Sequence, residues 1–212
     1  LTVRTPYGGG IAGGLYHSQS PEAYFAHTPG LKIVVPRNPY QAKGLLRASI
    51  KDDNPVIFFE PKRLYRASTG EVPEEDYSIE LGKAEVVQEG SDITVLAWGA
   101  QMEIIEDAAK QASEQGIHCE VIDLRSILPW DIDTIAKSVT KTGRLVISHE
   151  APITNGFGAE IAASIQQACF LHLESPILRV CGLDTPYPLA LEKEYVPDAL
   201  KVLAAIKQSM DF

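Results

Sequence analysis

A histidine with polar neighbours follows directly on a glycine-rich stretch near the start of the chain. Five glycines lie among the seven positions from Gly8 to Gly14, and Tyr-His-Ser-Gln follows at residues 16–19. Glycine lets a backbone approach a ligand or another chain closely, and a histidine gives or takes protons near neutral pH. The stretch therefore predicts either the wall of a site in which His17 handles protons, or a flexible loop whose histidine only bonds its neighbours.

The glycines also match the dinucleotide-binding spacing G-x-G-x-x-G at Gly8, Gly10 and Gly13. That fingerprint requires a helix that opens at the motif and an acidic residue about 20 positions further on, at the end of a second strand. Residues 15–20 look irregular here, and the next strand ends in Pro36-Arg37. We interpret the spacing as coincidental, and a nucleotide-binding domain stays a minor alternative.

Two other groups of polar residues lie where chemistry is possible. His149 and Glu150 follow a predicted strand and form either an acid–base pair, or polar residues that cap a helix or line a subunit interface. The second interpretation is favoured, because neither a nucleophile nor a set of metal ligands accompanies them. Asp52-Asp53-Asn54 offers oxygen ligands for a cation, but such a group is also an ordinary turn at a helix end.

Composition limits the class of protein. The 212 residues are 45% hydrophobic with a net charge of −9, which argues against the basic surface of a nucleic-acid-binding protein. No run of about 18 apolar residues indicates a membrane span. Cys119, Cys169 and Cys181 lack a C-x-x-C spacing, so they predict buried thiols in a reducing compartment rather than a zinc site or disulfides.

Strands and helices alternate along the chain, which predicts an α/β fold of parallel βαβ units with right-handed crossovers. The predicted strands lie at residues 1–5, 31–35, 56–59, 84–87, 92–98, 119–124, 144–148 and 177–181. The predicted helices lie at residues 21–27, 39–51, 101–115, 131–141, 156–170 and 197–210.

The stretch 62–81 has little apolar periodicity and an acidic segment, Glu71–Asp76, so it predicts a linker able to wrap over a surface. We therefore expect a first unit at residues 1–65, a linker at 66–80 and a second unit at 81–212. The chain starts inside a predicted strand without a Met or a targeting segment. This start predicts that it is the C-terminal portion of a longer polypeptide.

Several longer motifs carry a resemblance. They are YHSQSPEA at residues 16–23, FFEPK at 58–62, DLRSILPWD at 123–131, SHEAP at 148–152 and RVCGLDTPYP at 179–188. Together they resemble the β subunits of thiamine-diphosphate-dependent 2-oxo acid dehydrogenases. Within that family, FFEPK, DLRSILPWD and SHEAP resemble the branched-chain enzymes more than the pyruvate enzymes.

The resemblance implies a fold and an assembly. The first unit would be the end of a pyrimidine-binding domain, and the second a transketolase C-terminal-like domain. The family assembles as an α2β2 heterotetramer in the mitochondrial matrix and passes acyl groups to a lipoyl acyltransferase core. Thiamine diphosphate lies between the subunits, with its magnesium held by the α subunit. The glutamate that activates the cofactor precedes the HSQ motif, and so would precede Leu1.

The resemblance also implies roles for single residues. His17 would be the active-site histidine, which protonates the thiolate released when the lipoyl disulfide opens, and Ser18 and Gln19 would orient its ring. The glycines would allow close packing at a subunit boundary. A potassium ion would be held, largely through backbone oxygens, by Leu1, Thr2, Ser49, Asp52 and Asn54.

The expected function is therefore oxidative decarboxylation of branched-chain 2-oxo acids with reductive acylation of lipoyl groups. One alternative is the pyruvate dehydrogenase β subunit, which differs in its substrate. Another is a non-catalytic module that docks the acyltransferase core while catalysis takes place elsewhere.

Overall fold

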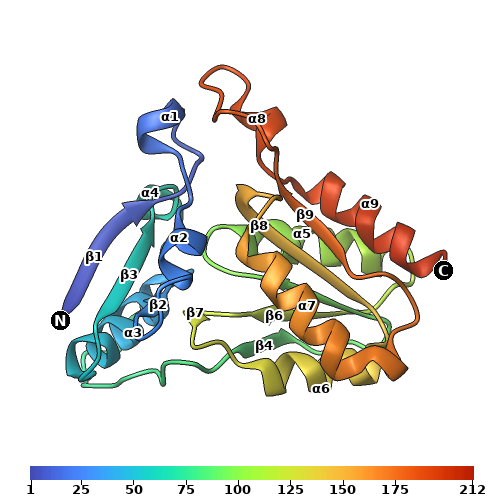
Figure 1. The fold of residues 1–212 in the computed structure, drawn as a ribbon, viewed down its shortest axis with the longest axis horizontal. Helices are drawn as coiled ribbons and strands as arrows, with labels where there is room; N and C mark the ends of the chain where they lie inside the picture. Colours follow the sequence, from blue (N-terminus) through green and yellow to red (C-terminus); the bar gives the residue numbers. More distant parts are fainter.

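The computed structural model describes residues 1–212 and contains two sheets that lie side by side (Figure 1). The first sheet has the strand order β1-β3-β2-β7, and the second has the order β4-β6-β5-β8-β9. The two termini lie at opposite ends of the molecule. Strands alternate with helices through most of the chain, so the predicted α/β class is confirmed.

Three strands of the first sheet run parallel: β1 (Thr2–Tyr7), β3 (Val56–Pro61) and β2 (Lys32–Val34). Strand β1 continues through Pro6 to Tyr7, whereas the sequence predicted that it would end at Thr5. The difference arises because β1 is an edge strand. An edge tolerates proline, since a position facing away from the ladder needs no N–H donor.

The fourth strand of this sheet comes from the second half of the chain. Strand β7 (Ser126–Leu128) pairs antiparallel with β2, and Ile127 at its centre is fully buried. The sequence did not predict β7, because three residues are too few to show the alternation of a strand. The first sheet is therefore completed by residues that the sequence assigned to the second unit.

The second sheet is centred on β5 (Ile93–Ala97), in which every residue is buried. Strands β6 (Cys119–Asp123), β8 (Leu145–Pro152) and β9 (Leu178–Gly182) extend the parallel part. Strand β4 (Glu85–Gln88) runs antiparallel to β6, so the parallel sheet of the predicted βαβ units carries one antiparallel edge strand. An antiparallel edge strand on an otherwise parallel sheet is common, since an edge does not need coverage on both faces.

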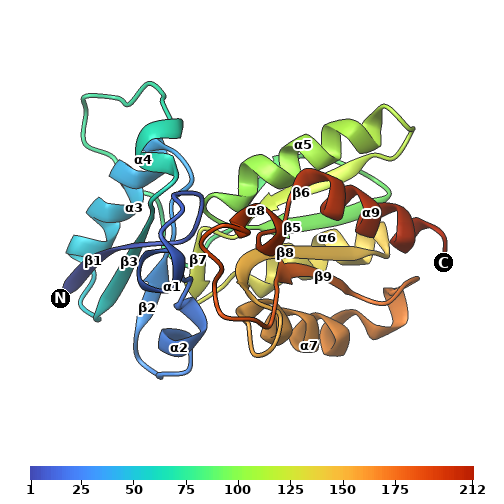
Figure 2. The ribbon, with the colours of Figure 1, turned by 90° about the horizontal axis from the view of Figure 1, so that it is seen from above.

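Helices cover both faces of the second sheet (Figure 2). Helices α5 (Gln101–Ser113) and α9 (Ala199–Met210) pack together on one face, and α6 (Ile132–Thr142) and α7 (Phe157–Cys169) on the other. Asp131 caps the start of α6 by accepting a hydrogen bond from the Thr134 N–H, and Gly143 ends that helix with φ of 71°. These four helices were predicted and are confirmed. They could be predicted because each has a clear cap or an apolar face in its sequence.

Helix α3 (Pro39–Lys51) covers the outer face of the first sheet. Asn38 caps it by accepting a hydrogen bond from the Gln41 N–H at 2.8 Å, and Pro39 opens the first turn, as predicted. The buried residues between α3 and the sheet are Val34, Leu45, Val56 and Phe58.

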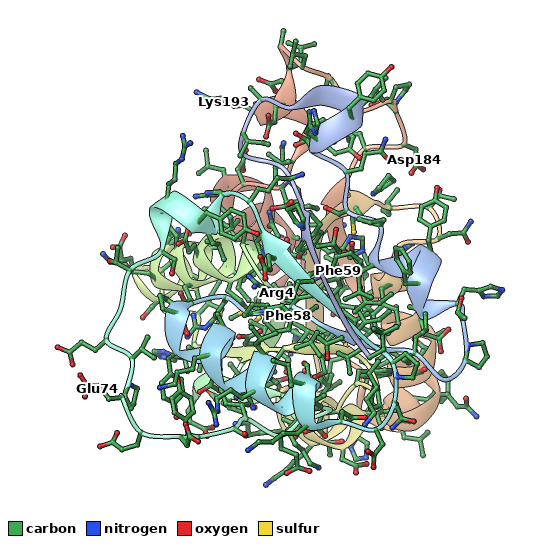
Figure 3. The ribbon with its side chains drawn as sticks, turned by 90° about the vertical axis from the view of Figure 1, so that its left-hand side faces the viewer. Arg4, Phe58, Phe59, Glu74, Asp184 and Lys193 are labelled. Carbon is green, nitrogen blue, oxygen red and sulfur yellow. The ribbon has the colours of Figure 1, made fainter.

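The segment after β3 runs along α3. It begins with the short helix α4 (Leu64–Ala67), and further on the Ile79 N–H donates to the Gly44 carbonyl at 3.1 Å. The Lys43 ammonium contacts the carbonyls of Pro73, Glu74 and Glu75. Figure 3 shows Glu74 at the outer edge of the molecule. The segment thus wraps over a surface, while the division at residues 65 and 80 stays a prediction.

The remaining helices are short: α1 (Gly14–His17), α2 (Glu22–Ala26), α8 (Glu192–Tyr195) and a 3₁₀ helix at Phe170–His172. Helix α1 lies in a stretch that the sequence predicted to be irregular, because four residues show no helical period. None of the helices is long and apolar enough to cross a membrane.

One hydrophobic core extends from the first sheet into the second. Tyr7, Ile33 and Phe59 of the first sheet belong to the same buried cluster as Ile147 of the second sheet and Trp98, which directly follows β5. The two sheets therefore share one core, to which α6 and α7 also contribute buried side chains.

Candidate active site

His17 is the last residue of α1, and its side chain is exposed. Its neighbour Tyr16 is 91% exposed, so α1 projects from the body of the protein. Helix α1 lies at the same end of the molecule as α8 (Figures 1 and 3), and Gly14 packs next to Leu189, just before α8. The predicted active-site histidine is thus accessible to a group that approaches from outside the chain.

Ser18 and Gln19 stabilise the backbone around α1. The Ser18 hydroxyl is fully buried and accepts a hydrogen bond from the Gly13 N–H at 3.0 Å. The Gln19 amide donates to the Leu15 carbonyl at 2.9 Å. Neither of these two hydrogen bonds involves the His17 ring, so the role of Ser18 and Gln19 in orienting that ring stays a prediction.

The glycine loop (residues 8–13) packs against the second half of the same chain. The Gly9 N–H donates to the Glu150 carboxylate at 2.8 Å, and the N–H groups of Gly10 and Ala12 donate to the Glu192 carboxylate. A side chain at Gly9 would overlap the hydroxyl of Tyr187. The glycines therefore permit a close approach within this chain, and their role at a subunit boundary stays a prediction.

Two partly or fully buried carboxyls, Glu150 and Glu192, bind this loop, and the buried Glu22 carboxyl lies close to Glu150. We call Glu22, Glu150 and Glu192 the acidic cluster. The Glu22 side chain is 1% exposed; one oxygen accepts from the Trp98 indole N–H at 3.3 Å, and the other has no partner. Burial raises the pKa of Glu22 to about 7 and also raises the pKa of Glu150. Glu22 and Glu150 thus hold their protons more tightly than carboxyls in water do.

His149 does not form a pair with Glu150. Its ring stacks on Trp98 with centroids 5.3 Å apart, Nδ1 lies 3.1 Å from the Ala151 carbonyl, and Nε2 lies 3.2 Å from the Cys181 sulfur. Burial lowers the pKa of His149 to about 4, so the ring is neutral at pH 7. Glu150 instead binds the glycine loop of the same chain. A place for these two residues at a subunit interface stays a prediction.

The five predicted potassium ligands lie near one another. The Thr2 hydroxyl donates to the Ser49 carbonyl at 2.8 Å, and the carboxylate of Asp52 accepts two hydrogen bonds from Asn54, each at 2.9 Å. The Leu1 carbonyl accepts from the Val56 N–H at 2.9 Å. Lys32 lies 2.5 Å from Asp52 and, with Asn54, lowers the pKa of that carboxyl to about 2. An ion here would therefore depend mainly on backbone oxygens.

No group of three or more His, Cys, Asp or Glu side chains in the chain is arranged to hold a metal. A groove of about 930 Å³ lies between α2 and α7, and a pocket of about 360 Å³ lies beside β1 and α3. The sequence did not predict the groove, since its lining comes from separated segments: Ser20–His27, Leu128–Trp130 and Ala151–Glu160.

Comparison with known families decides how this arrangement is classified. The family model described as "Transketolase, C-terminal domain" matches residues 82–202. The chain belongs to this family. The model described as "Transketolase, pyrimidine binding domain" matches residues 1–68, which precede the transketolase C-terminal domain. Both fold types expected from the resemblance are thereby confirmed.

The relatives of this transketolase-family chain carry consistent names. A 2-oxoisovalerate dehydrogenase subunit beta, mitochondrial, from Dictyostelium discoideum is 62% identical over 211 residues, which cover 99% of this chain and 57% of the relative. The subunit beta 2, mitochondrial, from Arabidopsis thaliana is 58% identical and is covered to 59%. The Pseudomonas aeruginosa subunit beta is 49% identical and is covered to 64%.

These matches confirm the resemblance to the branched-chain members of the family. The chain spans less than two thirds of the length of these relatives. Among solved structures, one described as "Split gene transketolase, inactive beta4 tetramer" matches with a TM-score of 0.80 and 24% identity, over 99% of this chain and 66% of that one. This similarity shows the transketolase-like fold.

Proposed function

We propose that this chain is the C-terminal portion of the β subunit of a branched-chain 2-oxo acid dehydrogenase, which oxidatively decarboxylates branched-chain 2-oxo acids and acylates lipoyl groups. The observation that carries the proposal is the exposed His17 at the end of a loop held by the second half of the chain. The names of the relatives support the choice of branched-chain substrates.

The residues present fit one wall of a thiamine diphosphate site. The open imidazole of His17 suits contact with a cofactor at a subunit boundary, whereas the chain lacks a carboxylate set for the magnesium of the diphosphate. We assign the diphosphate and its magnesium to the α subunit and to the part of the longer β subunit outside residues 1–212. When bound, the cofactor supplies the decarboxylation of the 2-oxo acid and the transfer of the acyl group.

His17 acts as a general acid in this proposal. Reductive acylation opens the lipoyl disulfide and leaves one sulfur as a thiolate, to which protonated His17 gives its proton. Exposure of His17 at the tip of α1 lets a lipoyl group carried by another protein reach the ring. The buried Ser18 hydroxyl and the Gln19 amide hold the backbone of α1 during this step.

The test is His17→Ala in the complete β subunit assembled with its α subunit. We expect lipoyl acylation to fall by about 10²–10⁴-fold, the range for loss of a general acid, while decarboxylation measured with an artificial electron acceptor is largely retained. The control is His172→Ala, which changes an exposed histidine of the second half. Unimpaired acylation in His17→Ala would instead favour the assembly-module alternative.

Substrate choice separates the two enzymatic alternatives. The reconstituted enzyme should show a higher kcat/KM for 3-methyl-2-oxobutanoate than for pyruvate. A preference for pyruvate would identify the pyruvate dehydrogenase β subunit instead.

The proposed assembly is an α2β2 heterotetramer that serves a lipoyl acyltransferase core in the mitochondrial matrix. Mitochondrial names among the relatives and a tetrameric transketolase with the same fold support this assignment. A nucleotide is not a proposed partner, because the N–H groups of the glycine loop already hold carboxylates.

We also propose that Leu1, Thr2, Ser49, Asp52 and Asn54 hold a potassium ion. Support comes from the clustering of their backbone and side-chain oxygens where β1 starts and α3 ends. At about 100 times its dissociation constant, a bound ion stabilises the folded state by about 2.7 kcal/mol. The assembled enzyme should therefore have a higher Tm in KCl than in NaCl of equal ionic strength, and Thr2→Val should reduce the difference. Equal Tm values in the two salts would contradict the site.

A further inference from the structure

Two carboxylates from the second half of the chain accept hydrogen bonds from three backbone N–H groups of the glycine loop. Glu150 accepts from Gly9, and Glu192 accepts from both Gly10 and Ala12, the latter at 2.6 Å. The N–H of Ile11, between the two Glu192 contacts, has no partner within the chain. Glu192 therefore grips the loop at two points with its two oxygens.

Glu192 is itself firmly placed. Its side chain is 9% exposed, and it opens helix α8, whose last residue Tyr195 is buried against Gly182 of β9. The Lys201 ammonium of α9 donates to the carbonyls of Glu194 and Val196, each at 2.9 Å. Helix α8 is thus fixed to the second sheet and to α9. Through Glu192, the position of α8 determines where the glycine loop lies.

The loop in turn determines where α1 lies. Gly13 follows Ala12 directly and donates to the buried Ser18 hydroxyl, so the backbone on both sides of α1 is held. His17 lies within this short closed segment, 175 residues away from Glu192 along the chain. A shift of the loop would therefore move the imidazole of His17.

We infer that Glu192 is a positioning residue for His17, through its bonds to the N–H groups of Gly10 and Ala12. The catalytic consequence rests on the proposed function, whereas the contact itself does not. A carboxylate is suited to this role because its two charged oxygens accept from two donors at once and bind N–H groups more strongly than neutral acceptors do.

The contact is first tested in the unmodified full-length subunit, assembled with its partner. Residue-resolved hydrogen exchange should show slow exchange at Gly10 and Ala12 and exchange at least tenfold faster at Ile11. Equal rates at all three amides would overturn the inference, with no variant needed.

The role is then tested with Glu192→Gln and Glu192→Asp, using Glu194→Gln on the same helix as the control, since the Glu194 side chain is exposed. Glu192→Gln should speed exchange at Gly10 and Ala12 by at least tenfold. It should lower kcat for lipoyl acylation by at least tenfold with little change in KM for the 2-oxo acid, and Glu192→Asp should restore part of both. Glu194→Gln should change neither.

Faster exchange with unchanged acylation would show that Glu192 holds the loop without positioning His17, and would overturn the inference. Unimpaired acylation in His17→Ala would overturn the proposed function instead, while the exchange pattern would still report on the Glu192 contact. The two failures are thus distinguishable.

Discussion

Glu22 is a carboxyl that the fold removes almost completely from water. It is buried, and one of its carboxyl oxygens has no hydrogen-bond partner. A negative charge on the nearby Glu150 would also oppose the ionisation of Glu22. A carboxyl in such a place keeps its proton, because burial disfavours the charged form. Glu22 is thus a neutral hydrogen-bonding group in mildly acidic solution and a costly buried charge in alkaline solution.

This property predicts a pH dependence of stability. The pKa of Glu22 rises from 4.5 to about 7 on folding, so the folded state binds more protons than the unfolded state between these values. Stability from this group is therefore lost as pH rises through that window, by about 3 kcal/mol in total. In Glu22→Gln, the free energy of unfolding should fall less between about pH 5 and about pH 8 than in the unmodified protein. Urea unfolding at both pH values measures the effect.

The control for this experiment is Glu80→Gln, which changes an exposed carboxylate. Its pH dependence should follow that of the unmodified protein. Parallel pH curves for Glu22→Gln and the unmodified protein would show that Glu22 titrates as an ordinary exposed carboxyl.

At the residue scale, the sequence identified a functional residue only where that residue lies within a recognisable local motif. His17 could be found because it lies within a recognisable run of residues, and its exposure agrees with the role expected of it. Glu22 and Glu192 could not be found, because a glutamate in the first turn of a helix most often faces solvent. Only the fold brings Glu192 to the glycine loop and Glu22 to the indole of Trp98, each far away in the chain.

At the scale of elements, the glycine loop depends on the absence of a side chain at Gly9. A Cβ there would overlap the Tyr187 hydroxyl and lie 3.2 Å from a Glu192 oxygen. Gly9→Ala should therefore destabilise the protein by about 1–3 kcal/mol, the usual cost of overpacking. Gly70→Ala should change stability by less than about 0.5 kcal/mol, because its Cβ would meet only Pro39 at 3.8 Å. Urea unfolding of both variants tests the difference.

The segment after α4 depends on Lys43. Its ammonium holds three successive carbonyls and also lies 5.1 Å from the centre of the Tyr77 ring. Lys43→Met should free the segment and speed cleavage after Glu71, Glu74 and Glu75 by a glutamate-specific protease severalfold. Lys137→Met, at an exposed site on α6, is the matched control. Equal cleavage rates in the two variants would show that Lys43 does not restrain the segment.

The helices and strands also show which elements a sequence pattern can predict and which it cannot. Helices of eleven to thirteen residues, such as α3, α5 and α6, were predicted because caps and apolar faces repeat over several turns. The short elements α1, α8 and β7 were missed, since three or four residues cannot display a period. These short elements are held by tertiary contacts, and two of them form the surroundings of His17.

At the scale of the whole molecule, the shared core predicts that both sheets unfold together. Ile33 of the first sheet and Trp98, which directly follows β5 of the second, lie in one buried cluster. Ile33→Val should cost about 0.5–1.5 kcal/mol and should lower the urea midpoint of tryptophan fluorescence, although both tryptophans lie outside the first three strands. Far-ultraviolet circular dichroism should report the same midpoint. Two separate transitions would contradict a single cooperative unit.

Strand β7 gives this arrangement a topological consequence. The segment 69–80 joins the two halves covalently. Non-covalent contacts join them as well, because β7 pairs with β2 and because Glu150 and Glu192 bind the glycine loop. A single cut after Glu74 would therefore leave two pieces that remain assembled and co-elute as one particle. The folded structure therefore does not depend on an unbroken peptide chain, and the two halves, expressed as two separate chains, should still assemble into one particle.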